Sequence, residues 1–447
     1  MPEILAFCGL AVVYVSLSLL GPDSKNLRYH STRQIRQIAR SIAAFGFVVP
    51  ILVDRNNSIV AGVGRFLAAQ LLGMDVVPVM RLEHLTEAQT KALRIADNRL
   101  TELASWNDRL LAETLKELTE IDLDFSLEAT GFTVAEIDLR IEGLSTAQND
   151  AADSADQLPR PTNHSVVSKA GDLWHLGRHT LLCGNALSAD SFHGLLGYKR
   201  AQMVFTDPPY NVPIHGHASG KGRIQHREFA MPAGELDVVE FTSFLTRSCA
   251  LIAKYSIDGC IHFVCIDWRH VGELLEAGRL AYTELKNICV WVKDNGGMGS
   301  LYRGRHEFVF VFKSGTSSHR NNVQLGRYGR NRTNVWPYPC ANTFSRQSDE
   351  GYLAALHPTV KPVAMVADAM LDCSARGDLV LDPFLESGTT LIAAERVGRC
   401  CYGMEIDPLY VDTIVRRWQA FTGDNAVHAV TGKCFDDLVG EAEARHD

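Results

Sequence analysis

One stretch near the carboxyl end, residues 378–407, limits the choice of fold more than any other part of the chain. It opens with the apolar run Leu379 to Leu381, reaches Asp382, and passes through a glycine-containing turn into a helix-like segment. A second apolar run follows and ends on the acid Glu405. Strand, turn, helix and strand in this order form a βαβ unit, which requires parallel strands covered by helices. The pattern predicts an α/β fold with a doubly wound, mostly parallel sheet.

The same stretch has the spacing of a nucleotide-binding turn. Gly388 allows close approach of the backbone to a ligand, and Thr389 begins the helix. Glu405 follows the turn at about 20 residues, the distance at which an acid reaches ribose hydroxyls in such folds. We therefore expect a ribose-bearing ligand at this edge of the sheet.

A second strand-like run, Met203 to Thr206, leads directly into Asp207, Pro208, Pro209 and Tyr210. Prolines cannot continue a central strand, so the chain must leave the sheet here and present the acid and the tyrosine at its carboxyl edge. A carboxylate and a backbone carbonyl that accept hydrogen bonds from an exocyclic amine would direct its lone pair toward a methyl donor. Tyr210 offers a face on which an extruded base can stack. The alternative is a Pro-Pro loop with an incidental acid.

Between these two segments lies His357-Pro-Thr-Val-Lys-Pro, at the start of a predicted helix. Lys361 could pair with the carboxylate of an amino-acid-like cofactor. An ordinary solvated lysine at a helix start is the equal alternative, and the residues alone do not separate the two.

The length of 447 residues favours two domains and a linker. Residues 11–143 read as a small α+β domain that opens with a buried strand and continues with a helix capped by Ser31 and ended by Gly46. Residues 144–165 are small, polar and acidic, which is typical of a flexible linker. Residues 166–440 form the predicted α/β domain.

Composition indicates a cytoplasmic protein. The apolar start, Leu5 to Leu20, lacks the basic segment of a signal peptide, and no later stretch is long enough to span a bilayer. The eleven cysteines show no metal spacing, so we expect reduced thiols and no metal. A net charge of -8 excludes a uniformly basic chain but permits a local basic groove.

Together these motifs resemble the β group of the DNA amino-methyltransferases, which have a Rossmann-like domain dependent on S-adenosylmethionine. The resemblance implies methyl transfer to the exocyclic amine of a flipped base in double-stranded DNA, with adenine N6 favoured by the Asp-Pro-Pro-Tyr form and cytosine N4 left open. It implies cofactor contacts by Asn185, Lys361, Asp382, Phe384, Ser387, Gly388, Thr389 and Glu405.

The amino-terminal part resembles ParB/sulfiredoxin-type domains through residues 50–54, 59–69 and 77–79. Val63 stands where these domains usually have a polar residue, so we expect DNA contact or docking rather than nucleotide hydrolysis. In the cofactor turn, Glu386 replaces the usual Gly, and its side chain could obstruct the cofactor and leave a weakened DNA-binding or regulatory protein. Asn185 replaces an Asp, but its amide oxygen can still accept a hydrogen bond.

The target-recognition region is expected at about residues 211–350. Basic residues interleaved with glycine and aromatic residues suit phosphate contact and base stacking. The candidate DNA-binding residues are Lys221, Arg223, Arg227, Arg320, Arg327, Arg330 and Arg332. Solvated loops are the alternative. A homodimer and a role in restriction-modification are compatible with the resemblance.

Overall fold

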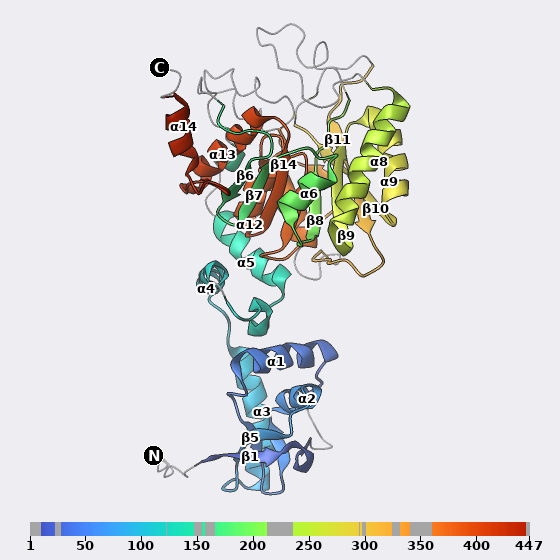
Figure 1. The fold of residues 1–447 in the computed structure, drawn as a ribbon. Helices are drawn as coiled ribbons and strands as arrows, with labels where there is room; N and C mark the ends of the chain where they lie inside the picture. The colour runs from blue at the N-terminus through green and yellow to red at the C-terminus, as the bar shows by residue number, and fades with distance from the viewer. Residues whose placement is uncertain are drawn as a thin grey trace. The chain divides into compact units, whose positions relative to one another are not determined.

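The computed structural model describes residues 10–22, 28–121, 123–146, 154–156, 166–211, 236–294, 296, 301–323, 331–339 and 360–443. The chain divides into two compact units, residues 1–147 and 148–447. Figure 1 shows a small sheet with helices in the first unit and a large helix-covered sheet in the second. None of the helices in the described ranges is long and apolar enough to cross a membrane.

The first unit has a five-stranded sheet in the order β1-β5-β3-β4-β2. Its strands are β1 (Val12–Ser16), β2 (Gly21–Pro22), β3 (Ile51–Val53), β4 (Ser58–Ala61) and β5 (Val76–Arg81). Its helices are α1 (Thr32–Phe45), α2 (Val63–Leu71), α3 (Glu87–Leu103), α4 (Asp108–Glu120) and α5 (Val134–Thr146). Ser31 caps α1 by accepting a hydrogen bond from the Gln34 amide, and Gly46 ends it at a φ of 78°, as predicted.

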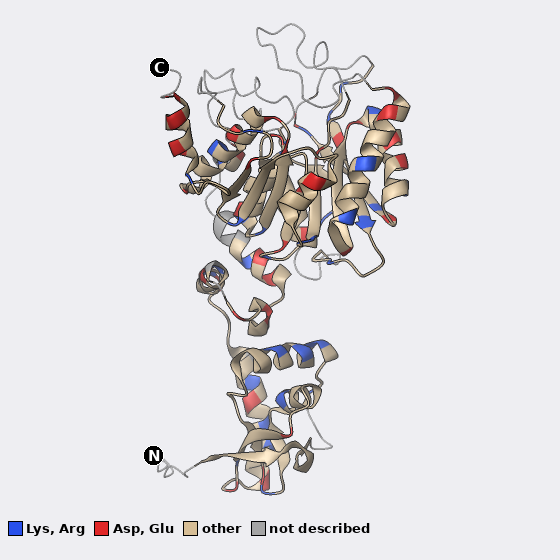
Figure 2. Cartoon of the chain, viewed as in Figure 1, with Lys and Arg blue, Asp and Glu red and all other residues tan. Residues whose placement is uncertain are grey.

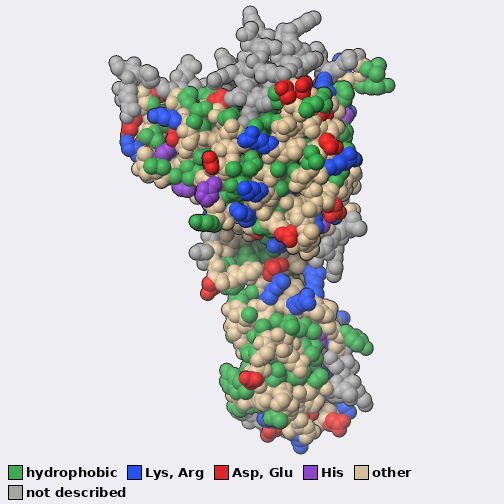
Figure 3. Space-filling model, turned by 45° about the vertical axis from the view of Figure 1, so that its right-hand side comes forward, with side chains coloured by type: hydrophobic (Ala, Val, Ile, Leu, Met, Phe, Trp, Pro, Cys, Tyr) green, Lys and Arg blue, Asp and Glu red, His purple; other side chains and the backbone are tan. Residues whose placement is uncertain are grey.

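The prediction that the opening strand is buried was wrong. The strand is present as β1, but Val12, Val13 and Tyr14 are exposed and only Val15 is buried. The reason is topological: β1 is an edge strand with β5 as its neighbour in the sheet. In the view of Figure 3, hydrophobic side chains are accordingly visible on the surface of this unit.

The second unit has a ten-stranded sheet in the order β12-β10-β11-β9-β8-β13-β14-β7-β6-β15. Its strands are β6 (Leu173–Leu176), β7 (His179–Cys183), β8 (Ala201–Thr206), β9 (Ser256–Ile266), β10 (Glu284–Val292), β11 (His306–Ser314), β12 (Val335–Pro337), β13 (Leu379–Asp382), β14 (Cys400–Glu405) and β15 (Val427–His428). The five central strands, β9, β8, β13, β14 and β7, are mutually parallel. Antiparallel neighbours flank them on both sides.

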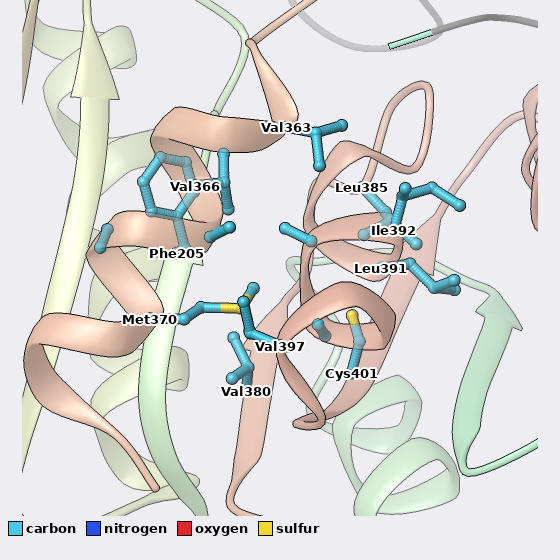
Figure 4. Close-up of a cluster of buried hydrophobic side chains, with 14 of the residues drawn as sticks. Phe205, Val363, Val366, Met370, Val380, Leu385, Leu391, Ile392, Val397 and Cys401 are labelled. Carbon is cyan, nitrogen blue, oxygen red and sulfur yellow. The ribbon is translucent and has the colours of Figure 1, made fainter. Parts of the chain in front are cut away.

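Helices cover both faces of this sheet. They are α6 (Ala189–Leu196), α8 (Val238–Lys254), α9 (Val271–Ala281), α11 (Val363–Cys373), α12 (Thr389–Val397), α13 (Pro408–Thr422) and α14 (Phe435–Glu443). Along β8, Met203 and Phe205 pack in the cluster with α11, α12 and α13, whereas Val204 packs in the cluster with α6. This alternation is the period of two that a strand covered on both faces must have. Figure 4 shows Val363, Met370 and Leu391 within the first of these clusters.

The order of the strands creates a switch point between β8 and β13. From β8 the chain continues to its neighbour β9, whereas from β13 it continues to β14 on the other side. Open α/β sheets bind ligands at the carboxyl ends of strands at such a point. Asp207, Asp382 and Glu405 lie at the carboxyl ends of β8, β13 and β14.

Part of the predicted flexible linker is packed in the second unit. Residues Ser154–Asp156 form a short 3-10 helix, and Ala155 is only 3% exposed within the main core cluster. Asp156 Oδ1 accepts a hydrogen bond from the Val363 amide at 2.8 Å, at the start of α11. Small residues cannot make a core, but a single alanine can fill a gap in one that large side chains have made.

Candidate active site

Asp207 is buried at the end of β8, and both of its carboxylate oxygens have partners. Tyr210 donates its hydroxyl hydrogen to Oδ1, and the Lys361 ammonium contacts Oδ2. Asp207 is only 6% exposed. Burial raises the pKa of Asp207, and Lys361 opposes this rise. The acid and the tyrosine thus meet as the sequence predicts.

Glu307, on β11, joins the same cluster and was not predicted. Its Oε2 lies 3.2 Å from Lys361 Nζ and 3.1 Å from the Tyr210 hydroxyl, and its Oε1 contacts the ammonium of Lys293. Burial alone would raise the pKa of Glu307, but Lys361 and Lys293 lower it to about 2. Two carboxylates and two ammonium groups therefore balance one another in a largely buried site.

A signal for Glu307 exists in the sequence. The residue directly precedes the apolar run Phe308 to Phe312, and a charged side chain at the edge of a buried strand requires a partner. Its partner Lys293 follows β10, where Trp291 pairs with Glu307 across the two antiparallel strands. Only that register brings the two charges together.

Lys361 belongs to this cluster. Its ammonium contacts Asp207 and Glu307, and it lies 5.3 Å from the centroid of the Tyr210 ring. These carboxylates raise the pKa of Lys361 well above its ordinary value, although burial opposes them. In this structure Lys361 is an ion-pair partner of Asp207 and Glu307, and its pairing with a cofactor carboxylate stays a prediction. His357, Pro358 and Thr359 lie outside the described residues.

Asp382 supports the turn between β13 and α12 from within. Its Oδ1 accepts hydrogen bonds from the Thr206 hydroxyl at 2.9 Å and the Phe384 amide at 3.1 Å, and its Oδ2 accepts one from the Thr390 hydroxyl. Burial raises the pKa of Asp382 to about 7. These bonds join the end of β8 to the start of α12.

Glu405 lies beside this turn at the end of β14. Its Oε1 accepts a hydrogen bond from the Asp407 amide at 2.9 Å, and its Oε2 accepts one from the Glu386 amide at 3.1 Å. Burial raises the pKa of Glu405 to about 7. The Ile406 amide is a third backbone donor to this carboxylate. A carboxylate has about four lone-pair sites, so the oriented acid can still accept a hydrogen bond from a ligand.

The backbone of the turn has two residues with positive φ. Gly388 has a φ of 85°, and a Cβ there would lie 3.1 Å from the side chain of Ile414. Glu386 has a φ of 49°, which costs an L-residue on the order of 1–3 kcal/mol. The sequence argument that Glu386 occupies a position suited to glycine thus agrees with its backbone conformation.

The other predicted cofactor residues have partners within the protein. Ser387 and Thr389 are buried against the guanidinium of Arg417, which donates to the Ser387 carbonyl at 2.9 Å. Phe384 is 7% exposed and packs against Phe244. Asn185 is exposed, and its Oδ1 accepts a hydrogen bond from the Leu187 amide at 2.8 Å. These residues shape the turn and the neighbouring loop.

Comparison with known families decides what this arrangement belongs to. Residues 201–416, which contain both the Asp207 cluster and the Glu405 turn, match the N6/N4 DNA methylase family. The chain contains an N6/N4 DNA methylase domain. Ahead of this domain, residues 9–99 match the ParB N-terminal domain, and residues 109–170 match the ParB-methyltransferase helix-turn-helix domain. The range 11–143, predicted as one domain, is therefore divided between two family matches, and the second match continues through the predicted linker to residue 170.

Individual relatives resemble different parts of the methylase. The ParB-like nuclease domain-containing protein YnaK of Escherichia coli (strain K12) is 46% identical over 80 residues, which are 18% of this chain and 92% of YnaK. The type II methyltransferase M.HpaI of Haemophilus parainfluenzae is 23% identical over 58% of this chain and 80% of its own length. The solved PvuII DNA methyltransferase (cytosine-N4-specific) is 15% identical, covers 64% of this chain and 96% of its own, and has a TM-score of 0.41.

Two of the predicted DNA-binding arginines of the methylase lie in structural ion pairs. Arg332 contacts Asp368 and Asp372 on α11 at 3.0 Å each, and its side chain is 19% exposed. Arg320 lies 3.8 Å from Asp378, which precedes β13 and so lies at the opposite end of that strand from Asp382. The Arg320 side chain is 44% exposed, and the predicted phosphate contacts of both arginines stay predictions. Lys221, Arg223, Arg227, Arg327 and Arg330 lie outside the described residues.

Proposed function

We propose that this methylase transfers a methyl group from S-adenosylmethionine to the exocyclic amine of a flipped base in double-stranded DNA, and that the base is adenine. The observation that carries the proposal is the alignment of Asp207, Asp382 and Glu405 at the carboxyl ends of three adjacent parallel strands, β8, β13 and β14. In this proposal, Asp207 would accept hydrogen bonds from the target amine, and Glu405 would accept them from the ribose at the same edge of the sheet.

The residues at this edge fit S-adenosylmethionine. The cofactor carries two positive groups, a sulfonium and an ammonium, and only one carboxylate. This edge of the sheet is rich in acids, because Glu386 lies near Asp207, Asp382 and Glu405. Glu405 is the residue that would hold the ribose hydroxyls, because both of its oxygens are oriented by backbone amides. When bound, the cofactor supplies an electrophilic methyl group.

The part of Asp207 in the reaction follows from its surroundings. Its oxygens and the Pro208 carbonyl would accept hydrogen bonds from the target amine and localise its lone pair. As the bond between nitrogen and methyl forms, the nitrogen becomes positive and must lose a proton. Asp207 can accept this proton, because burial raises its pKa. Lys361 would keep the carboxylate ionised before the reaction.

Adenine is favoured over cytosine because the motif after β8 begins with Asp rather than Ser. We extend to this chain the type II description that M.HpaI carries, and propose a site-specific modification enzyme. DNA binding would be shared with the helix-turn-helix segment at residues 109–170. Its described helices α4 and α5 pack together through Leu115, Ile137 and Ile141.

The test is methylation of duplex DNA with methyl-labelled S-adenosylmethionine, followed by digestion and mass spectrometry of the nucleosides. The proposal expects N6-methyldeoxyadenosine from DNA treated with the natural protein. It expects no methylated nucleoside from DNA treated with Asp207→Ala. N4-methylcytosine would keep the methyltransferase and change its target. A folded protein that binds DNA and cofactor but labels neither base would contradict the proposed reaction.

A further inference from the structure

Glu386 lies between the two halves of the proposed active site. Its amide nitrogen donates to Glu405 Oε2 at 3.1 Å, which ties it to the expected ribose position. Its carboxyl group is within electrostatic range of Asp207 and Lys361, and it contributes to the raised pKa of Lys361. The Glu386 side chain therefore lies between Glu405, the proposed acid for the ribose, and Asp207, the proposed acid for the target amine.

If the proposed function is correct, the sulfur of the cofactor must lie between Glu405 and Asp207, because it carries the transferred methyl group together with the ribose and methionine carbons. The amino-acid end begins at that sulfur. A glycine at position 386 would adopt the φ of 49° without strain and would leave more room. A strained backbone position is retained when the side chain that it carries has a use. The carboxyl group of Glu386 is the feature that glycine could not supply.

We propose that Glu386 determines cofactor specificity by pairing its carboxylate with the α-ammonium of the methionine end of S-adenosylmethionine. The inference rests on the proposed function. The pairing would select adenosyl ligands that carry a free ammonium over those that lack it. In the site without ligand, burial and then Asp207 raise the pKa of Glu386 well above its ordinary value. An arriving ammonium lowers that pKa again, so binding should release a proton.

The test uses calorimetric titration of the full chain with three ligands: S-adenosylmethionine, S-adenosylhomocysteine, and its deamino analogue, which lacks only the ammonium. Each is titrated into the natural protein, Glu386→Gln and Glu386→Gly. Glu276→Gln, on the exposed side of α9, serves as the matched control. Thermal melts establish that all four proteins are folded.

The natural protein and the control should bind S-adenosylhomocysteine at least about tenfold more tightly than the deamino analogue, which is about 1.4 kcal/mol. Glu386→Gln should lose this preference while it retains affinity for the deamino analogue. Titrations in buffers of different ionisation enthalpy should show less proton release on binding by Glu386→Gln than by the natural protein.

Other outcomes separate the two proposals. An unchanged preference in Glu386→Gln would overturn the role of Glu386 and leave the proposed function intact. Tighter binding of S-adenosylmethionine by Glu386→Gly than by the natural protein would show that Glu386 obstructs the cofactor instead of recognising it. If the folded natural protein binds none of the three ligands, the proposed function itself fails, and this inference fails with it.

Discussion

At the scale of single residues, the unusual feature is that one lysine is shared by two buried acids. Lys361 contacts Asp207, the proposed acceptor for the target amine, and Glu307, whose other oxygen contacts Lys293. Burial raises the pKa of Asp207, Lys361 lowers it, and Glu307 raises it. The two neighbouring charges therefore act in opposite directions on a buried acid, and variants of the two should have opposite effects.

Lys361→Met should move the acidic limb of the pH–rate profile to higher pH. Burial and Glu307 both raise the pKa of Asp207, and the variant removes the ammonium that lowers it. Glu307→Gln should move that limb to lower pH. Each shift should be about one pH unit or more, since neighbouring charges shift buried carboxyl pKa values by about 1–3 units. Single-turnover methylation rates between pH 5 and 9 measure both limbs.

Lys433→Met is the control for these variants, because Lys433 is a half-exposed surface lysine paired with Glu441. It should leave the profile unchanged. Shifts of the same sign in Lys361→Met and Glu307→Gln would contradict the balance that we infer from the cluster.

Glu405 predicts a pH dependence of cofactor binding. Burial raises its pKa to about 7, so its ionised form, which we propose accepts both ribose hydroxyls, is lost as the pH falls below that value. The affinity for S-adenosylmethionine should therefore be about tenfold weaker at pH 6 than at pH 8. Calorimetry at these pH values measures it. Glu405→Gln should bind weakly at both, and a pH dependence as strong as that of the natural protein would assign the effect to another group.

At the scale of elements, a buried histidine joins β7, β14 and α12 at the end of the sheet opposite to the site. His179 Nδ1 accepts a hydrogen bond from the Cys401 amide at 2.8 Å, so Nε2 carries the hydrogen that is donated to Glu395 at 2.8 Å. Trp418 on α13 donates to the same Glu395 oxygen at 3.0 Å. Neutral His179, on β7, thus satisfies a backbone amide of β14 and a carboxylate of α12 at the same time.

This histidine should make the second unit sensitive to acid. Burial lowers the pKa of His179 below its ordinary value of 6.5, so the unfolded chain binds a proton that the folded chain resists. Stability should therefore fall as the pH drops below about 6.5. The hydrogen bond from His179 is the main influence that lowers the pKa of Glu395 to about 2, against burial, and stability should fall again as the pH drops below about 4.5.

His179→Ala should lower the free energy of unfolding by about 2–4 kcal/mol at pH 8, because it leaves buried partners unsatisfied. Urea unfolding at pH 8 and pH 5.5 measures both effects. His175→Ala changes an exposed histidine of β6 and serves as the control. A destabilisation equal to that of the control would contradict the assigned role.

A second link between elements is Arg417, on α13, which reaches two otherwise separate segments. Its guanidinium donates to the Ser387 carbonyl in the cofactor turn and to the Ala155 carbonyl in the 154–156 segment, both at 2.9 Å. Burial lowers the pKa of Arg417 to about 10, so the group remains charged at neutral pH. The turn at Ser387 is therefore supported by α13, a helix that follows the turn in the chain.

Arg417→Met should destabilise the second unit by about 2–4 kcal/mol and weaken the binding of S-adenosylmethionine, because the turn loses its support. Denaturant unfolding and calorimetry of the same sample measure the two effects. Arg279→Met, at an exposed position on α9, should change neither. Unchanged cofactor affinity in a destabilised Arg417→Met would limit the role of Arg417 to folding.

At the scale of the whole molecule, the chain has two units with separate cores. The first is built around Val15, Ile51, Phe66 and Val79, and the second around the large clusters on both faces of its sheet. Figure 2 marks the arginine positions of α1 in blue, and Arg36 and Arg40 on this helix are exposed. We therefore expect the second unit to bind the cofactor and the first unit to contribute a share of the DNA affinity.

A fragment of residues 148–447 should fold alone and bind S-adenosylmethionine with an affinity within about threefold of the full chain. Its affinity for duplex DNA should fall by about tenfold or more, with a weaker salt dependence, because phosphate-contacting cations are lost. Fluorescence anisotropy at several salt concentrations measures this. Equal DNA affinity of fragment and full chain would remove the first unit from DNA binding. The predicted homodimer stays a prediction that light scattering of the full chain can test.

The sequence by itself determined the local elements of this protein. The apolar runs before Asp207 and Glu405, the prolines after Asp207 and the glycine turn before α12 predict strand ends and a helix start from neighbouring residues alone. Because parallel strands bring their carboxyl ends to one edge, these local patterns also predicted that the two acids share a site. Family resemblance then supplied the chemistry.

Only the tertiary structure decided which charges meet. Glu307 reaches Lys293 through the register of β10 and β11, and Lys361 reaches Asp207 across 154 positions of sequence. The docked Ala155 and the ion pairs of Arg332 also depend on distant partners. Periodicity describes a residue's own element, whereas a buried charge is placed by the free-energy cost of leaving it unpaired, and that cost depends on every segment packed around it.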